Sequence, residues 1–222
     1  MKLIPSFEEI SATVLTICII VFLSVNLWNL WKKYEEKKDE KYFAEHPRPR
    51  GPIYSVTAFG TLVFWIQCIL YPILVLTNVM QRFETLPLQL SFSYDYVLRW
   101  FGLSLLVFGF SLFIWSVIAR GRYATSWEMS EKHRLVTWGP YRFVRHPSYL
   151  SYFLMFFGMF LVWLNLLAIV PIFAIPGYVR IVGDEEKLLV KRFGDQYIRY
   201  QKVTGRFFPR IRENKELGEN TN

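Results

Sequence analysis

The sequence predicts an all-α integral membrane protein with five transmembrane helices, the last two a tight hairpin, plus a C-terminal cytoplasmic amphipathic helix. Apolar residues make up 53% of the 222 residues and aromatic residues 18%, more than an ordinary soluble domain carries. Long uncharged runs alternate with charged segments, and the net charge of +8 lies mainly beside those runs. Charge in these places indicates membrane orientation and contact with anionic lipid rather than nucleic-acid binding.

The chain has the length of a single membrane domain, residues 1–222, with the part that would bind a cofactor at 120–212. About 20 apolar residues cross a hydrocarbon core. The expected helices are residues 10–31, 54–80, 94–119, 148–163 and 166–182. The last two are expected to form a hairpin around Asn165, because joined together they exceed any bilayer and contain Pro171 and Pro176.

Four residues inside the apolar runs predict local features of the helices. Pro72 is expected to kink the second helix, with neighbouring helices satisfying the freed carbonyl. Gly102 and Gly109 would allow the third helix to pack closely. Arg99 is costly towards lipid, so we expect it either to reach the near interface or to face the bundle interior.

Lysine and arginine counts predict the orientation. The segment 31–51 holds seven, 120–147 holds six and 180 onward holds ten. The positive-inside rule then puts the N-terminus outside and the C-terminus in the cytoplasm, with five crossings. Residues 184–203 repeat apolar side chains at helical spacing, which predicts the amphipathic helix.

Two polar stretches, residues 135–152 and 183–200, flank the apolar pair of runs. A hairpin would bring them to the same membrane face, so we interpret them as halves of one active site at the cytoplasmic surface. For single residues in these stretches, purely structural explanations without a catalytic role stay open. Arg142 and Arg145 fit positive-inside charges, and Tyr141, Tyr149 and Tyr152 fit interface aromatics. Glu185 and Glu186 fit carboxylates at the start of a helix.

Six motifs occur in order between about residues 127 and 209: HRLV at 133–136, GPY at 139–141, RHPSY at 145–149, EE at 185–186, FGDQY at 193–197 and GRFFP at 205–209. In order and spacing they resemble the isoprenylcysteine carboxyl methyltransferases with their prokaryotic relatives, allied to the phospholipid N-methyltransferases. The N-terminal half is similar only in being apolar.

The resemblance implies an S-adenosyl-L-methionine site at the cytoplasmic interface. The residues that would line it are His133, Arg134, Leu135, Val136, Tyr141, His146, Pro147, Ser148, Tyr149 and Glu185. A carboxylate such as Glu185 suits the cofactor's ammonium, and Arg or His suits its carboxylate. Methyl transfer is an in-line displacement that needs no metal, so alignment and desolvation are the protein's contribution.

The sequence departs from the family pattern at two positions. Ser151 stands where the family usually has glycine, and its hydroxyl either crowds the cofactor or bonds back into its helix. The family's substrate arginine usually stands four residues before the cofactor glutamate, where this chain has Ile181. Arg180 is our candidate for binding the acceptor carboxylate. Arg180 and Glu185 are the candidate catalytic residues, and Glu186 is expected to point elsewhere.

The favoured function is an S-adenosylmethionine-dependent methyltransferase with a lipidic acceptor from the membrane, above all a prenylcysteine-like carboxylate. Phospholipid or thiol methylation is an alternative within the same chemistry. An NADPH-dependent sterol-type reductase is the alternative enzyme, since a similar His-Pro-x-Tyr element occurs there. A non-catalytic membrane scaffold or a transporter is the third. Neither nucleic acid nor metal is an expected partner, and Cys18 and Cys68 lie in apolar runs without a CxxC pattern.

Overall fold

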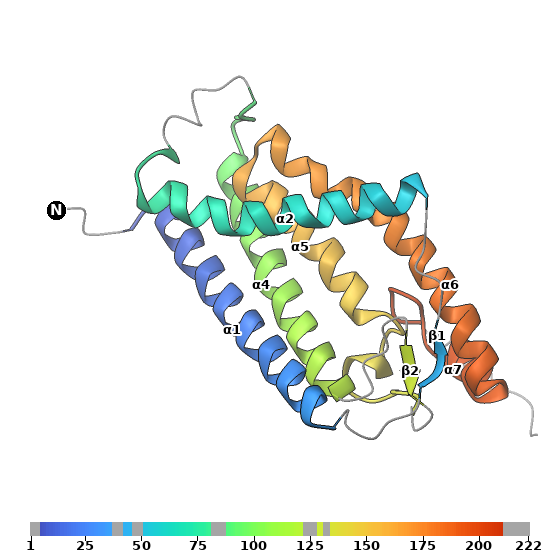
Figure 1. The fold of residues 1–222 in the computed structure, drawn as a ribbon. Helices are drawn as coiled ribbons and strands as arrows, with labels where there is room; N and C mark the ends of the chain where they lie inside the picture. The colour runs from blue at the N-terminus through green and yellow to red at the C-terminus, as the bar shows by residue number, and fades with distance from the viewer. Residues whose placement is uncertain are drawn as a thin grey trace, which may run out of the picture.

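The computed structural model describes residues 5–36, 42–45, 51–80, 88–121, 128–130 and 134–210. The helices in chain order are α1 (Phe7–Glu36), α2 (Pro52–Leu76), α4 (Asp95–Arg120), α5 (Pro147–Trp163), α6 (Ile175–Phe193) and α7 (Asp195–Val203). Two 3-10 helices, η3 (Gly139–Arg142) and η4 (Leu166–Ala174), flank α5, and the short strands β1 (Tyr42–Glu45) and β2 (Glu128–Ser130) pair antiparallel (Figure 1). The fold is helical, as predicted, apart from this two-stranded ribbon.

Four segments in the described part of the chain are long and apolar enough to cross a membrane: Phe7–Lys32, Pro52–Leu76, Asp95–Arg120 and Leu166–Phe193. The remaining predicted span corresponds to α5, which is apolar but has 17 residues. These helices expose many large apolar side chains, such as Ile20, Leu27 and Leu76. Exposed apolar surface of this extent suits lipid rather than water, so the chain is an integral membrane protein.

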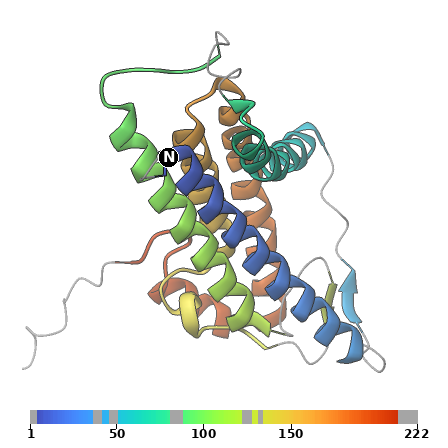
Figure 2. The ribbon, with the colours of Figure 1, turned by 90° about the vertical axis from the view of Figure 1, so that its left-hand side faces the viewer.

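Helices α1, α4 and α5 run side by side, and α2 lies across them (Figures 1 and 2). Glycines allow the tight contact between α4 and α5. A Cβ atom on Gly102 would lie 2.5 Å from the Leu161 Cβ, and one on Gly158 would lie 2.8 Å from the Gly102 carbonyl oxygen. A Cβ on Gly109 would come within 2.7 Å of the Met155 side chain. The close packing predicted from Gly102 and Gly109 is therefore confirmed.

The chain reverses between α5 and η4, where the hairpin was expected. Leu164 takes the left-handed conformation with φ 47°, and the Asn165 side-chain oxygen accepts a hydrogen bond from the Leu167 backbone nitrogen at 2.9 Å. Residues 88–90 hold the turn from outside, since the Leu90 nitrogen donates to the Leu164 carbonyl. Asn165 thus caps the returning helix in the manner of a side-chain N-cap.

The C-terminal helices differ from the expected boundaries. We expected one helix to end at residue 182 and an amphipathic helix over 184–203, but η4 runs directly into α6, which continues to Phe193. Gly183 does not interrupt the helix, because a single interior glycine costs only about 1 kcal/mol. Gly194, with φ 51°, ends α6, and α7 follows at once. The amphipathic part is therefore divided into two helices.

Arg99 faces its neighbours in the bundle. Its guanidinium pairs with Glu8 of α1 at 2.8 Å, lies 4.6 Å from the Phe7 ring centroid and donates to the Val162 carbonyl at the end of α5. Of the two expected placements, the interior one is correct, because α1 supplies a counter-ion.

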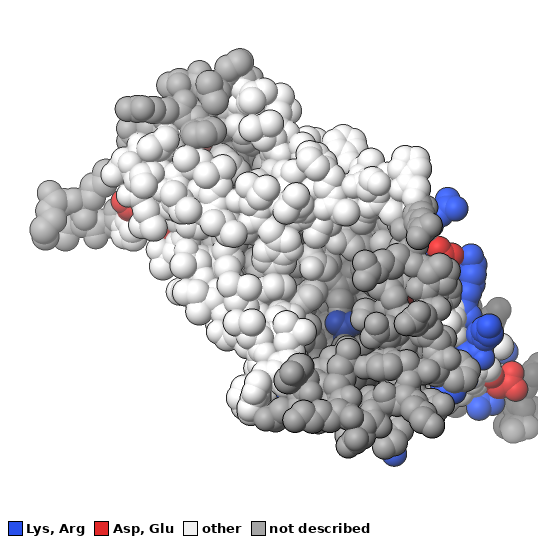
Figure 3. All heavy atoms as spheres, viewed as in Figure 1, with Lys and Arg blue, Asp and Glu red and all other residues white. Residues whose placement is uncertain are grey.

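Basic side chains gather at one end of the molecule. Figure 3 shows Lys and Arg atoms along the right-hand edge, over the C-terminal part of α6, whereas the surface over α1 and α2 is almost free of charge in that view. The polar stretches identified in the sequence lie at this charged end, where they form the site described next.

Candidate functional site

The two polar stretches meet, and a third segment joins them. The backbone nitrogens of Arg145 and His146 donate to the carbonyls of Gly205 and Arg206 at 2.8 and 3.1 Å. Val144 and Gly205 form a parallel bridge, so residues 205–206 pair like a short strand with residues 144–146, just before α5. The motif that precedes α5 is thus clamped between that helix and the segment after α7.

A cavity of about 230 Å³ lies where α4, α5, α6 and α7 come together with residues 135–141. Its walls are Phe113, Arg120, Leu135, Val136, Tyr141, Arg145, His146, Ser148, Tyr149, Tyr152, Glu185, Leu189, Tyr197 and Tyr200. Seven of these are residues that the sequence nominated for the cofactor: Leu135, Val136, Tyr141, His146, Ser148, Tyr149 and Glu185. Residues separated by some fifty positions in the chain therefore share one cavity.

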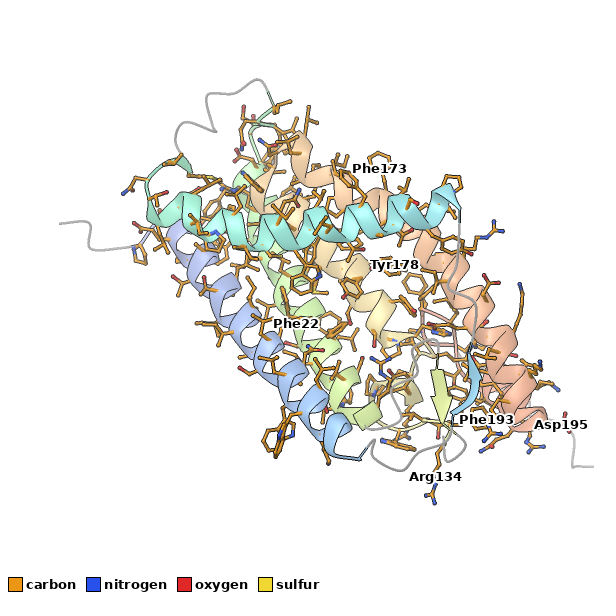
Figure 4. All side chains as sticks on the ribbon, viewed as in Figure 1. Phe22, Arg134, Phe173, Tyr178, Phe193 and Asp195 are labelled. Carbon is orange, nitrogen blue, oxygen red and sulfur yellow. The ribbon has the colours of Figure 1, made fainter. Side chains whose placement is uncertain are left out.

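The other nominated residues lie elsewhere. Arg134 is exposed, and Figure 4 shows it pointing away from the bundle. Pro147 is buried at the first position of α5, where its fixed φ suits a helix start, and it does not line the cavity. His133 is outside the described residues.

Arg180 does not reach the cavity. It is exposed on α6, five residues before Glu185. On a regular helix five residues correspond to a rotation of about 500°, which leaves the two side chains about 140° apart. Pro176 and Gly177 do not turn Arg180 towards the site, because α6 is already helical from Ile175 onward.

Glu185 stands beside His146 and Tyr149, as expected. The Tyr149 hydroxyl donates to Glu185 Oε1 at 2.5 Å, and His146 Nδ1 lies 3.8 Å from Glu185 Oε2. The Glu185 side chain is 27% exposed, and this residue lines the cavity. Its carboxylate is therefore held by partners on α5 and its start while one side remains available to a ligand.

Glu186 is more deeply placed than the sequence suggested. It accepts from Arg145 Nε at 2.9 Å, from Arg206 Nη2 at 2.5 Å and from His146 Nε2 at 3.3 Å. It points away from the cavity, as expected, but it holds three segments together. His146 thus contacts both neighbouring carboxylates of α6: its Nδ1 faces Glu185, and its Nε2 faces Glu186.

Arg145 is part of this construction. Besides Glu186, its guanidinium donates to the backbone carbonyls of Gln201, in the last turn of α7, and of Thr204, just after that helix. Its side chain is 9% exposed. The interpretation of Arg145 as an ordinary positive-inside charge was therefore wrong, whereas the exposed Arg142 remains compatible with that role.

Seven cavity residues were not nominated individually for the cofactor. Five of them lie within the two polar stretches, and Phe113 and Arg120 lie outside: Phe113, Arg120, Arg145, Tyr152, Leu189, Tyr197 and Tyr200. Helical spacing contains part of the missing signal. Phe113 and Arg120 are seven residues apart on α4, and Leu189 follows Glu185 by four on α6, so each pair shares a helix face. No pattern in the sequence indicated that these faces meet.

Arg120 is the charged cavity residue with a buried polar atom that lacks a hydrogen-bond partner in the described part of the chain. It is the last residue of α4, where a cation complements the helix dipole. Its buried Nε has no hydrogen-bond partner among residues 5–36, 42–45, 51–80, 88–121, 128–130 and 134–210. A buried donor without a partner is costly, so a ligand acceptor at this point would be strongly favoured.

Tyrosines close the polar end of the cavity. The Tyr200 hydroxyl donates to the Tyr141 carbonyl at 2.5 Å. Burial raises the pKa of Tyr141, of Tyr197 and of Tyr200 above the ordinary value for a phenol. These hydroxyls are therefore protonated at neutral pH and act as hydrogen-bond donors rather than as bases.

The opposite end is aromatic. Tyr152 lies 5.4 Å from Tyr178 of α6 in a stacked arrangement with an interplanar angle of 11°, and 5.4 Å from Phe113. The Tyr178 hydroxyl pairs with Thr61 Oγ1 of α2 at 2.7 Å (Figure 4 labels Tyr178). The cavity thus passes from a charged end to an apolar end inside the bundle.

The Ser151 departure does not alter the cavity. Its side chain is fully buried, and its hydroxyl donates to the Pro147 carbonyl one turn earlier at 2.7 Å. Of the two expectations for this residue, the bond back into the helix is the correct one.

Comparison with known proteins covers mainly the part of the chain that builds this site. The phospholipid methyltransferase family model matches residues 97–196. A protein-S-isoprenylcysteine O-methyltransferase from Tribolium castaneum is 36% identical over 87 residues, which are 38% of this chain and 31% of that protein. A solved structure of a eukaryotic intramembrane Ras methyltransferase, isoprenylcysteine carboxyl methyltransferase, is 26% identical with a TM-score of 0.47, and the match covers 73% of this chain and 54% of that one.

The chain therefore spans about a third of the length of the curated relative and about half of the solved one. The matched region includes α4, α5 and α6, which supply most of the cavity wall. The resemblance seen in the ordered motifs is confirmed: over this region the chain is similar to an isoprenylcysteine O-methyltransferase and to the phospholipid methyltransferase family.

Proposed function

We propose that this protein is an S-adenosyl-L-methionine-dependent methyltransferase that acts at the cytoplasmic membrane interface on a lipidic acceptor, a prenylcysteine-like carboxylate. The observation that carries the proposal is the cavity itself, which joins a charged end formed by Arg120, His146 and Glu185 to an aromatic end formed by Phe113 and Tyr152. An acceptor with an ionic head and an apolar chain would match these two ends, with the head at the charged end and the chain at the aromatic end.

The donor set fits the cofactor. Glu185 offers a partly exposed carboxylate to the ammonium of the methionine moiety, and His146 and the protonated tyrosines offer donors to its carboxylate. Leu135, Val136 and Leu189 supply apolar contact for a flat ring system. At about 230 Å³ the cavity is somewhat below the roughly 300–1,000 Å³ of common ligand sites.

Arg120, and not Arg180, is the residue that we propose for the acceptor carboxylate. Its buried Nε lacks a partner, and it lines the cavity on the same face of α4 as Phe113. A guanidinium binds a carboxylate through parallel hydrogen bonds, which orients as well as attracts it. Phe113, seven residues earlier on α4, would then contact the start of the apolar chain.

The protein's part in the reaction is alignment and exclusion of water. When bound, S-adenosylmethionine would supply an electrophilic methyl group to the acceptor oxygen, with the electron pair of the broken carbon–sulfur bond left on sulfur. A carboxylate is already nucleophilic at neutral pH, so no general base is required. Where the aromatic side chains Phe113 and Tyr152 keep water from the reacting atoms, the fixed charges around those atoms would act more strongly.

A phospholipid amine is the second candidate acceptor, because the phospholipid methyltransferase model matches 97–196. An amine has to lose a proton before transfer, and a base within reach would be needed. Glu185 already accepts the Tyr149 hydroxyl, lies near His146 and is assigned above to the cofactor's ammonium, so it is not available as that base. The charge pattern of the cavity thus favours an anionic acceptor.

A labelled-methyl assay on the purified full chain tests the proposal. The acceptors are a prenylcysteine, a phosphatidylethanolamine and a small apolar thiol, each with radiolabelled S-adenosylmethionine. We expect base-labile label on the prenylcysteine, as a methyl ester gives. Base-stable label on the phospholipid or thiol would move the acceptor to those classes. Absence of transfer to all three, with NADPH but not S-adenosylmethionine binding by calorimetry, would support the reductase.

A further inference from the structure

A second cavity, of about 350 Å³, lies outside the wall of the first. Its lining residues are Thr137, Arg142, Phe143, Tyr200, Val203, Thr204, Pro209 and Arg210. Tyr200 lines both cavities, and its hydroxyl bond to Tyr141 keeps the partition in place. Apart from Tyr200, the residues of this second cavity have no role in the methyl transfer proposed above.

The second cavity is cationic. Arg142 ends η3, and Arg210 follows the segment that pairs with the start of α5, so two guanidinium groups approach from separate elements. Arg142 makes neither an ion pair nor a hydrogen bond within the described ranges, and Arg210 donates to the neutral Lys202 carbonyl. None of the lining residues is acidic, so this positive charge is not neutralised there.

Its polar groups suit a phosphate. Two arginines can each present a planar fork of donors to phosphate oxygens, and Thr137 and Thr204 lie on the same wall. A carboxylate would use one guanidinium, whereas a phosphoryl group has enough oxygens for both.

Its apolar groups suit a lipid. Phe143 is 52% exposed and Val203 55% exposed at the cavity, and Phe208, close by in sequence, is 77% exposed. Large apolar side chains next to arginines, at the end of a membrane helix bundle, are typical of residues that contact lipid at the level of the headgroups. A free phosphate ion would gain nothing from them.

We propose that this second cavity binds the phosphate headgroup of an anionic phospholipid from the surrounding bilayer. Arg142 and Arg210 hold the phosphate, and the side chains of Phe143 and Val203 contact the glycerol and the upper acyl chains. The bound headgroup lies against the outer face of Tyr200, next to the first cavity. The proposal is independent of the methyl acceptor and holds even if the first cavity has another function.

The test measures lipid retention by the full chain. The protein is delipidated in neutral detergent, titrated with phosphatidylglycerol and analysed by native mass spectrometry. One phosphatidylglycerol should bind with preference over phosphatidylcholine. Because hydrogen bonds to charged groups are strong, Arg142→Gln with Arg210→Gln should weaken this binding by about tenfold or more. Arg199→Gln, which removes an exposed arginine of α7 outside the cavity, is the matched control and should bind as the wild type does.

Two further experiments distinguish a lipid headgroup from free phosphate and control for loss of folding in the variants. Inorganic phosphate should displace the lipid only weakly, and Phe143→Gln should weaken phosphatidylglycerol binding while both arginines remain. If the double glutamine variant is unstable in thermal unfolding, Arg142→Lys with Arg210→Lys keeps the charge and should give an intermediate loss. Equal binding in wild type and the double variant, equal loss in Arg199→Gln, or displacement by phosphate at the lipid's own concentration would each overturn the proposal.

Discussion

The Tyr149 hydroxyl donates a 2.5 Å hydrogen bond to Glu185 Oε1, which joins the start of α5 to the middle of α6 at the edge of the cavity. These residues are 36 positions apart, and the hairpin turn at Leu164 and Asn165 lies between them. The bond leaves the other carboxylate oxygen near His146. Together the three side chains form the part of the proposed cofactor site that can be tested most directly.

Glu185→Gln should weaken S-adenosylmethionine binding by roughly 10- to 150-fold, the loss expected for one charge-assisted hydrogen bond. Tyr149→Phe should have a smaller effect in the same direction, since the carboxylate keeps its charge. Calorimetry on the detergent-purified protein measures both. Arg199→Gln serves as the distant control. Wild-type affinity in both variants would place the cofactor elsewhere.

Glu186→Ala should destabilise the fold rather than act on the cofactor directly. It leaves the buried Arg145 and its neighbour His146 without their shared counter-ion. Removing one partner of a buried ion pair costs about 3–5 kcal/mol, and the 42% exposure of Arg206 reduces that partner's share. Thermal unfolding in detergent is the measurement. Arg206→Gln should reduce the stability much less. If Glu186→Ala were as stable as the wild type, Glu186 would not hold the segments of Arg145 and Arg206 together.

Gly158→Ala should destabilise the contact of α4 with α5 by about 1–3 kcal/mol, because the new methyl group would lie 2.8 Å from the Gly102 carbonyl oxygen. Gly183→Ala is the matched control: a Cβ there has no neighbour within 4 Å, and alanine favours a helix by about 1 kcal/mol. The two substitutions should therefore shift the unfolding temperature in opposite directions. An increase in the unfolding temperature of both variants would mean that helix propensity, not packing, decides the outcome.

Arg120→Gln should raise the KM for a carboxylate acceptor by tenfold or more, on the scale of about 1.5–3 kcal/mol for a charged hydrogen bond. Cofactor affinity should change far less. Arg180→Gln, with its exposed side chain, should leave acceptor use near wild type. Steady-state kinetics with a soluble prenylcysteine analogue would distinguish them, and the reverse ranking would restore Arg180 as the acceptor residue.

The orientation is tested by reporter fusions after Lys41 and after Asn222, both of which should report cytoplasm. The prediction follows from the basic residues in 31–51 and after 180. Reporters on opposite sides of the membrane would place the charged end of α6 apart from the loop after α1, and the positive-inside argument would fail for this chain.

The sequence by itself determined the features that depend on local composition. Uncharged runs identified the helical membrane protein, and Asn165 between two apolar runs located the hairpin turn, because hydrocarbon admits only backbone with internal hydrogen bonds. Gly102 and Gly109 indicated close helix packing. The motifs of 133–149 and Glu185 gave seven residues of the cavity wall.

Only the tertiary structure decided which distant faces meet. Arg120 and Arg145 have the same charge and both border apolar runs, yet Arg145 is neutralised by Glu186 while Arg120 keeps an unpartnered nitrogen. Arg180 lies one residue from the family's position, and its direction depends on α6 being continuous from Ile175 to Phe193. Charge and helical period are properties of a segment, but the pairing of a buried ion depends on what another segment places beside it, and that is set by packing.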